Sequence, residues 1–282
     1  MEIISSISAM QAWRSSLPPG LRVGFAPTMG NLHAGHLSLV ERAKSLSDVT
    51  VASIFVNPMQ FGESEDLDAY PRSLARDLES LREAGTAVVF TPSVVDIYPE
   101  GVEHHTAVEV PGLTDVLCGA SRTGHFKGVT TVVSKLFGAV RPDVAAFGAK
   151  DLQQVLVIKK LVRDLLMNTE VITVPTMREA DGLAMSSRNG YLTKTERQLA
   201  ARFPSVLTDC VTAVKSRSST IEDALEIARK ALIKHGFHID YLEARKTFDL
   251  TPATSLDAEV AIFGAVFVGK TRLIDNHVIP AL

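Results

Sequence analysis

The chain has 282 residues, of which 46% are hydrophobic and 22% are charged, the composition of an ordinary globular protein. Its formal net charge is −3 and no run is rich in lysine and arginine, which argues against a nucleic-acid partner bound mainly through phosphates. The acidic N-terminus lacks the basic region of a signal peptide, and no apolar run reaches membrane-spanning length. The two cysteines, Cys118 and Cys210, lie far apart and suit a reducing compartment as small buried residues. A cytoplasmic protein without membrane association is therefore expected.

The first part of the chain, residues 1–176, alternates apolar strands with helices. Strands are predicted at residues 22–26, 49–56, 87–90, 143–147 and 170–176. Helices are predicted at residues 7–17, 35–46, 73–84 and 129–140, and from the turn at 148–154 to about 167. Nearly continuous apolar strands separated by helices are typical of a buried parallel sheet. The pattern predicts a doubly wound, Rossmann-like α/β domain of five strands.

The composition changes after residue 176, and residues 177–282 are predicted to form a smaller α+β domain that acts as a lid. Helices are expected at 195–215 and 220–235, the second opened by a capping box from Ser219 to Glu222. Strands are expected at 240–244, 258–268 and 271–274. The aperiodic segment 177–190 between the two domains is predicted to be a functional hinge loop.

The loop between the first strand and the next helix contains Gly30, His33 and His36. Unpaired backbone N–H groups and the positive end of the helix dipole gather at such a position and favour a phosphate. Two imidazoles three residues apart can add hydrogen bonds, so an anionic, nucleotide-like ligand is the first hypothesis. A zinc site is less favoured because no Glu stands between the histidines and no third Cys or His is near. A purely structural, capping role for the histidines remains open.

Cationic residues recur at two later helix starts. Arg122, His125 and Lys127 lie in a glycine-bracketed stretch before the helix at 129–140, where either an anion site or a solvated loop is expected. Lys150 is predicted in the first turn of a helix, where a cation is unfavourable toward the dipole and an anionic ligand would compensate it.

Two further polar stretches have no assigned chemistry. The acidic segment at residues 62–70 is expected to be a loop or lid after a strand, where ligands of open α/β sheets bind. His104 and His105 are interpreted as exposed or structural.

The histidine loop and the Met-Ser-Ser-Arg sequence at 185–188 resemble the two signatures of the nucleotidylyltransferase superfamily, which includes the class I aminoacyl-tRNA synthetases. Within it the chain resembles the pantoate-β-alanine ligase (pantothenate synthetase) family along nearly its whole length. The matching segments are 27–30 with 33–36, 55–61, 70–72, 124–126, 147–154, 178–189 and 269–276. A single histidine motif is weak evidence, whereas seven motifs in the same order are specific.

This resemblance implies a HIGH-type nucleotidylyltransferase fold and the ATP-dependent condensation of pantoate with β-alanine. The reaction would use Mg²⁺, pass through a pantoyl-adenylate, and release pyrophosphate and AMP. The resemblance also suggests a homodimer.

Carried over residue by residue, the resemblance assigns roles to individual positions. Nucleotide contacts are expected from Met29, Gly30, Asn31, Leu32, His33, Ala34, Gly35, His36, Gly148, Ala149, Lys150, Asp151, Met177, Met185, Ser186, Ser187 and Arg188. Catalytic roles are expected for His36 as a proton donor, and for His33, Lys150, Ser187 and Arg188. Substrate contacts are expected from Gln60, Gln154, Arg122 and His125, and Asp77 is expected near the metal.

Two other functions remain open. A nucleotidylyltransferase that moves AMP onto a phosphorylated acceptor would want more cationic groups than the neutral surroundings of Gln60 and Gln154 suggest. A non-catalytic nucleotide-sensing or RNA-binding module is disfavoured by the net charge and by Lys150, Ser186 and Arg188.

Overall fold

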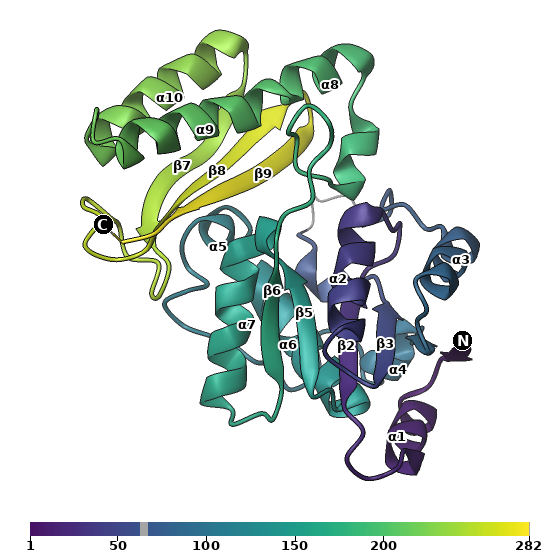
Figure 1. Cartoon of the computed structure of the whole chain (residues 1–282). Coiled ribbons are helices and arrows are strands. Elements are labelled where there is room, and N and C mark those ends of the chain that lie inside the picture. Colours follow the sequence, from purple (N-terminus) through teal and green to yellow (C-terminus); the bar gives the residue numbers. More distant parts are fainter. Residues whose placement is uncertain (63–66, 282) are drawn as a thin grey trace. The chain divides into compact units, whose positions relative to one another are not determined.

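The computed structural model describes residues 1–62 and 67–281, and the chain divides into two units (Figure 1). The first unit consists of Met1–Ala149 and Gln153–Pro175, and the second of Lys150–Leu152 and Thr176–Leu282. Each unit has its own cluster of buried hydrophobic side chains. Residues 63–66 of the acidic segment, for which a lid was predicted, lie outside the described residues.

The first unit is built on a parallel sheet. Its strands are β1 (Glu2–Ile4), β2 (Val23–Thr28), β3 (Val49–Ile54), β4 (Val88–Phe90), β5 (Val144–Gly148) and β6 (Glu170–Val174), in the order β1-β4-β3-β2-β5-β6. The predicted doubly wound α/β fold is confirmed, but the sheet has six strands rather than five. The sequence pattern missed β1 because this edge strand is three residues long and buries only its last residue.

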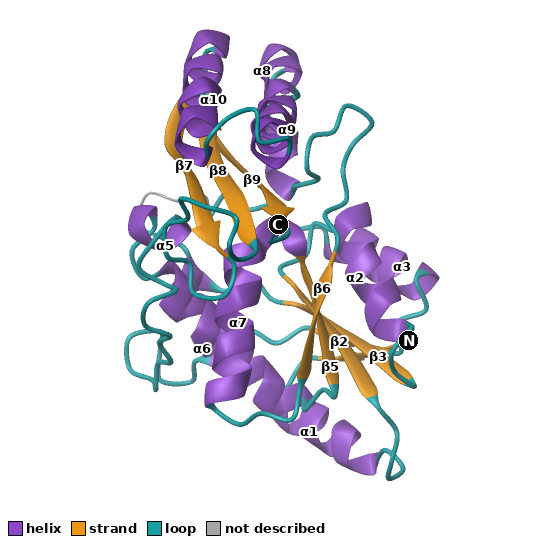
Figure 2. Cartoon of the chain, turned by 60° about the vertical axis from the view of Figure 1, so that its left-hand side comes forward, coloured by secondary structure: helices purple, strands orange, loops and turns teal. Residues whose placement is uncertain are grey.

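Helices lie on both faces of this sheet (Figure 2). They are α1 (Ile7–Ser16), α2 (Ala34–Lys44), α3 (Leu74–Glu83), α4 (Val94–Ile97), α5 (Cys118–Ser121), α6 (His125–Val140) and α7 (Leu152–Asp164), with 3-10 turns η1 (Pro58–Gln60) and η2 (Ala149–Asp151). Helix α6 begins four residues before the predicted start, because Gly124 adopts a left-handed conformation (φ +80°) at its N-cap. Among the described residues, no helix combines the length and the apolar character needed to cross a membrane.

The strand order places three chain segments at one edge of the sheet. The chain runs from β2 to β3 and β4 on one side, then returns to β5 on the other side of β2. Ligands of open α/β sheets bind outside the carboxyl ends of strands at such a reversal. The segments that follow β2, β3 and β5 carry Met29, Gln60 and Ala149, so the topology gathers expected site residues at this edge.

The second unit is an antiparallel sheet covered by helices (Figure 1). Its elements are η3 (Ser187–Tyr191), α8 (Lys194–Ala200), α9 (Arg202–Lys215), α10 (Ile221–His235), β7 (His238–Lys246), β8 (Val260–Val268) and β9 (Thr271–Ile279). The helix predicted at 195–215 is two helices, with Pro204 in the first turn of α9, where its missing N–H has no cost. The cap of α10 is Thr220, which accepts from the Asp223 backbone at 3.1 Å, one residue beyond the predicted Ser219.

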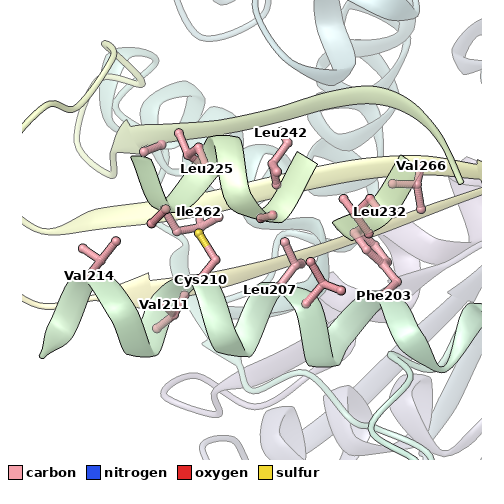
Figure 3. Close-up of a cluster of buried hydrophobic side chains, with 14 of the residues drawn as sticks. Phe203, Leu207, Cys210, Val211, Val214, Leu225, Leu232, Leu242, Ile262 and Val266 are labelled. Carbon is pink, nitrogen blue, oxygen red and sulfur yellow. The ribbon is translucent and has the colours of Figure 1, made fainter. Parts of the chain in front are cut away.

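The core of the second unit lies between α9, α10 and the sheet (Figure 3). Gly264 of β8 allows a close approach of α9, because a Cβ there would lie 3.0 Å from the Phe203 ring. Cys210 is part of this cluster, and burial raises the pKa of its thiol to about 11. Cys118 is also buried, so both cysteines are the small buried residues that were expected.

Two neighbouring residues of α10 test this core. Leu232 is 0% exposed, so Leu232→Ala should lower the free energy of unfolding by about 2–5 kcal/mol through lost burial and a cavity. Ile233 is 64% exposed, and Ile233→Ala should change it by less than about 1 kcal/mol. Urea unfolding followed by circular dichroism measures both, and equal losses would contradict this packing.

Candidate active site

The loop that leaves β2 is fixed by its own backbone N–H groups. Gly30 donates to Thr28 Oγ1 at 3.2 Å, while Asn31 and Leu32 donate to the two carboxylate oxygens of Asp77 at 2.8 and 2.9 Å. Gly30 and Asn31 have φ of +82° and +49°, which turns the chain sharply into α2. These N–H groups are already engaged, which corrects the expectation that the loop offers them unpaired to a phosphate. Nucleotide contacts through other atoms of these residues stay predictions.

His33 and His36 cap the helix that follows. His33 Nδ1 accepts from the Gly35 backbone at 3.1 Å, and His36 Nδ1 accepts from the His33 backbone at 3.3 Å. The capping role left open by the sequence is therefore present. A neutral imidazole that accepts at Nδ1 carries its proton on Nε2, so Nε2 is the donor atom of each ring. Capping and anion binding are thus compatible, with Ala34 and Gly35 forming the first residues of α2.

Asp77 on α3 does not fit the expected metal role. The residue is 1% exposed, and besides the two backbone donors its Oδ1 accepts from Ser73 Oγ at 3.1 Å. Three hydrogen bonds occupy most of the lone pairs of the carboxylate. The described residues contain no cluster of three or more side chains suited to hold a metal ion. Asp77 instead supports the loop that precedes the two histidines.

Gln60, at the end of η1, has a fixed amide orientation. Asn57 is buried, and its Nδ2 donates to the Gly128 carbonyl at 3.1 Å and to Gln60 Oε1 at 3.2 Å. Because the Gly128 carbonyl can only accept, the amide of Asn57 cannot flip without losing this bond. Tyr98 reinforces it by donating to Asn57 Oδ1 at 2.7 Å. Gln60 consequently directs its Nε2 donor toward Met29, with the sulfur 3.0 Å away.

Arg122 and His125 lie against the same residue. His125 Nδ1 is 2.8 Å from the main-chain carbonyl oxygen of Gln60, and Arg122 Nη1 is 3.0 Å from His125 Nε2. Since arginine only donates, His125 Nε2 accepts and its Nδ1 donates to Gln60. The structure thus brings Gln60, Arg122, His125 and Met29 together. The surroundings of Gln60 are not neutral, which corrects the expectation from the sequence.

The two glutamines at the start of α7 differ in their environment. Gln153 is buried and saturated: its Oε1 accepts from the Cys118 backbone at 3.1 Å, and its Nε2 donates to the carbonyls of Leu113 and Val116. Gln153 is therefore structural. Gln154 is half-buried, and its expected contact with substrate stays a prediction.

Lys150 and Asp151 belong to η2, directly before α7, and Lys150 is the first residue of the short stretch assigned to the second unit. Lys150 Nζ lies 3.8 Å from Asp151 Oδ1, so the neighbouring acid supplies the structural partner that seemed difficult to find from the sequence. The Lys150 carbonyl accepts from Asn276 Nδ2 at 2.9 Å. Gly148 and Ala149, which belong to the first unit, end β5 and begin η2.

Residues 177–190 form an internally hydrogen-bonded segment of the second unit, and the hinge role expected for them stays a prediction. Met185 donates from its backbone to the Met177 carbonyl at 2.9 Å. Ser186 caps η3 by accepting from the Arg188 backbone at 3.3 Å, and Ser187 is the first residue of that turn. These five expected nucleotide contacts, Met177, Met185, Ser186, Ser187 and Arg188, therefore share one short structure.

Arg197 of α8 cross-links the same segment. Its guanidinium donates to Glu179 and to Asp181, each at 2.6 Å. The hydrogen bond from Arg197 lowers the pKa of the Asp181 carboxyl. These contacts lie inside the second unit, whose boundary falls between residues 175 and 176.

Comparison with known proteins identifies the family. The family model described as pantoate-beta-alanine ligase matches residues 2–278. The chain belongs to the pantoate-beta-alanine ligase family. It is 50% identical over 275 residues to a pantothenate synthetase of Shewanella sediminis, covering 98% of this chain and 96% of the relative. It is also 53% identical over 267 residues to a pantothenate synthetase of Shewanella baltica, covering 95% of this chain and 94% of the relative.

Solved structures of the family have the same fold. The pantothenate synthetase of Thermus thermophilus matches with a TM-score of 0.92 and 44% identity, over 98% of this chain and 99% of that one. The Francisella tularensis pantoate-beta-alanine ligase, solved with beta-gamma ATP and beta-alanine, matches with a TM-score of 0.83 and 37% identity, over 99% and 97%. These matches confirm the predicted family and fold.

Sequence reasoning missed the residues that hold the expected site in place. Asn57, Arg178, Asp275 and Asn276 all lie inside segments that match the family, yet nothing in their local sequence reveals their partners. Tyr98 lies outside those segments, and only its burial and its bond to Asn57 reveal it. Membership of a matching segment was the one signal that could have singled out the first four.

Asp77→Ala separates a supporting role from a metal-binding one. The change removes the acceptors of the part-buried Asn31 N–H and of the buried Leu32 N–H, and a buried donor without its acceptor costs about 1–3 kcal/mol. We expect the free energy of unfolding, measured with EDTA present, to fall by about 2–5 kcal/mol. Glu79→Ala, at a position of the same helix outside this network, is the control. A metal ligand would give no loss in EDTA, so equal stability of both variants would contradict the supporting role.

Proposed function

We propose that the chain joins pantoate to β-alanine at the expense of ATP, through a pantoyl-adenylate, with release of pyrophosphate and AMP. Membership of the pantoate-beta-alanine ligase family over residues 2–278 carries this proposal. The Francisella relative bound to beta-gamma ATP and beta-alanine supports the same two substrates here. The fixed donor of Gln60 beside Arg122 and His125 supports a small anionic substrate with hydroxyl groups.

In the first step a carboxylate oxygen of pantoate attacks the α-phosphorus of ATP. A new oxygen–phosphorus bond forms, and the bond to the bridging oxygen breaks, so pyrophosphate leaves. The barrier is lowered by donors placed where charge develops on the phosphates. The Nε2–H groups of His33 and His36 and the ammonium of Lys150 are proposed for this role, and no covalent nucleophile is required.

In the second step the amine of β-alanine attacks the acyl carbon of the adenylate. The new carbon–nitrogen bond replaces the carbon–oxygen bond to AMP, and the nitrogen releases a proton. Adenylates hydrolyse easily, so the site must exclude water until β-alanine attacks the intermediate.

Pantoate recognition is proposed at Gln60 and Gln154. The Nε2 of Gln60 is held as a donor by Asn57, which suits an acceptor oxygen of pantoate. Arg122 adds a positive charge close to Gln60, with Nη2 3.4 Å from its carbonyl. A phosphorylated acceptor would also tolerate that charge, so family membership, rather than charge, favours the ligase over AMP transfer to a phosphate.

Other expectations stay predictions. Mg²⁺ would accompany the nucleotide, because this ion is commonly held by substrate phosphates and its own waters with only one or two carboxylates. The homodimer and the cytoplasmic location also rest on the resemblance and the composition alone.

Isotope exchange tests the adenylate. Pantoate alone should support exchange of labelled pyrophosphate into ATP in the presence of Mg²⁺, without β-alanine. His36→Ala should slow this exchange by about a hundredfold, the usual effect of removing a preorganised donor. His104→Ala, at an exposed position, should leave it nearly intact. Exchange that strictly required β-alanine would exclude a free adenylate and favour a concerted route.

Lys150→Ala measures the contribution of its charge. We expect turnover to fall by about a hundredfold or more, as removal of one preorganised charge contact does. The free energy of unfolding should change little, because the pair with Asp151 is long and partly exposed. Lys159→Ala, an exposed lysine of α7, is the matched control. Near-normal turnover of Lys150→Ala would remove this residue from the chemistry.

A further inference from the structure

Two adjacent residues of β9, Asp275 and Asn276, are buried although they are polar, with exposures of 3% and 8%. Successive side chains of a strand point to opposite faces of the sheet, so one strand can hold two different groups. The chemistry proposed above uses neither residue. The partner of Asn276 is Lys150 of the expected nucleotide site. The partner of Asp275 is Arg178, the neighbour of Met177 in that site.

Asp275 holds the segment that carries Met177 and Met185. Its Oδ2 accepts from Arg178 Nη1 at 2.7 Å, and its Oδ1 from Nη2 at 2.9 Å. Such a two-pronged pair fixes the plane of the guanidinium as well as its position. Arg178 Nη1 also donates to the Gly182 carbonyl at 3.0 Å, so the fork reaches the turn of the segment.

The backbone of Arg178 forms a bridge with that of Ala184, immediately before Met185. The position of Asp275 is thereby transmitted to the start of the Met185–Arg188 sequence. Asn276 holds the other part, because its Nδ2 donates to the Lys150 carbonyl at 2.9 Å. That bond fixes the main chain from which the Lys150 ammonium extends.

Stability alone is a weak reason for this arrangement. A buried ion pair often contributes little net stability, because desolvation offsets the attraction. Arg197 already cross-links the same segment through Glu179 and Asp181. The bonds of Asp275 and Asn276 differ from that cross-link in one respect. They start from a single strand and end at Lys150, an expected nucleotide contact, and at Arg178, the neighbour of the expected contact Met177.

We propose that Asp275 and Asn276 are positioning residues of the nucleotide site, Asp275 acting through Arg178 on the Met185–Arg188 sequence and Asn276 acting through the main chain of Lys150. The spacing of the two groups is then set by neighbouring positions on one strand. This inference rests on the proposed function, in which Lys150 and the Met185–Arg188 sequence contact ATP.

A double-mutant cycle tests Asn276. Asn276→Ala should lower kcat/KM for ATP in the exchange reaction about tenfold or more, while KM for pantoate stays within about twofold, since small misplacements of a charge are costly. In a Lys150→Ala background, Asn276→Ala should lower kcat/KM for ATP less than about twofold, because the ammonium that Asn276 positions is gone. Equal effects in the two backgrounds would mean that Asn276 acts on stability generally, and would overturn the proposal for this residue.

A parallel cycle tests Asp275. Asp275→Asn should lower kcat/KM for ATP about tenfold, and less than about twofold in an Arg188→Ala background. If Asp275→Asn fails to fold, Arg178→Lys serves instead, because it keeps the charge but loses the fork. The matched control is Asp240→Asn, which breaks the 2.7 Å pair with Arg272 in the same sheet and should give equal, small effects in every background.

A second readout separates this inference from the proposed function. The same cycles are measured for ATP binding by calorimetry, which needs no turnover. A wild-type protein that binds ATP but shows no pantoate-dependent exchange would reject the proposed function, while non-additive effects on ATP binding would still support the positioning roles. Additive effects on binding, equal to those of Asp240→Asn, would overturn them.

Discussion

The carboxylate of Asp77 fixes the turn on which the histidine motif depends. By accepting from Asn31 and Leu32 it holds two successive main-chain N–H groups, of which that of Leu32 is buried. This turn sets where α2 begins, and the first residues of α2 set the rings of His33 and His36. Their Nδ1 atoms accept from the helix start, so in the neutral rings Nε2 is the atom that carries the proton. The motif for which the sequence predicts two ligand-binding histidines is therefore also a helix cap.

The amide of Gln60 depends on a similar chain of constraints. Gly128 of α6 approaches η1 so closely that a Cβ there would overlap the carbonyl oxygen of Met59. This approach brings the Gly128 carbonyl to Asn57, whose amide then dictates that of Gln60. His125 at the start of α6 contacts the Gln60 main chain from the same helix. A glycine with no chemistry of its own thus determines that the Nε2 of Gln60, and not its Oε1, faces Met29.

Sequence patterns recovered the elements whose signal is local, such as the apolar runs of β2 and β3, and the motifs identified the family. Failures occurred where the signal is short or its cause is distant: β1 has only three residues, and the early start of α6 depends on the backbone of Gly124. The supporting partners were beyond sequence reasoning because Asp77 is 46 residues from Asn31, and Asp275 is 97 residues from Arg178. Only the folded chain brings these pairs within hydrogen-bonding distance. The residues next to Asp77 or Asp275 in the sequence do not show whether its carboxylate is buried and bonded or exposed to solvent.

Each unit uses a buried carboxylate to hold a loop, but the two do so with different donors. Asp77 accepts mainly from main-chain N–H groups, which any residue at positions 31 and 32 other than proline would supply. Asp275 accepts from the guanidinium fork of Arg178, which no other side chain reproduces. The bonds to Asp77 therefore make no demand on the side chains at positions 31 and 32, whose choice is limited instead by the positive φ of Asn31 and the burial of Leu32. The loop held by Asp275 depends on both partners, because loss of either one leaves a charge uncompensated in a buried place.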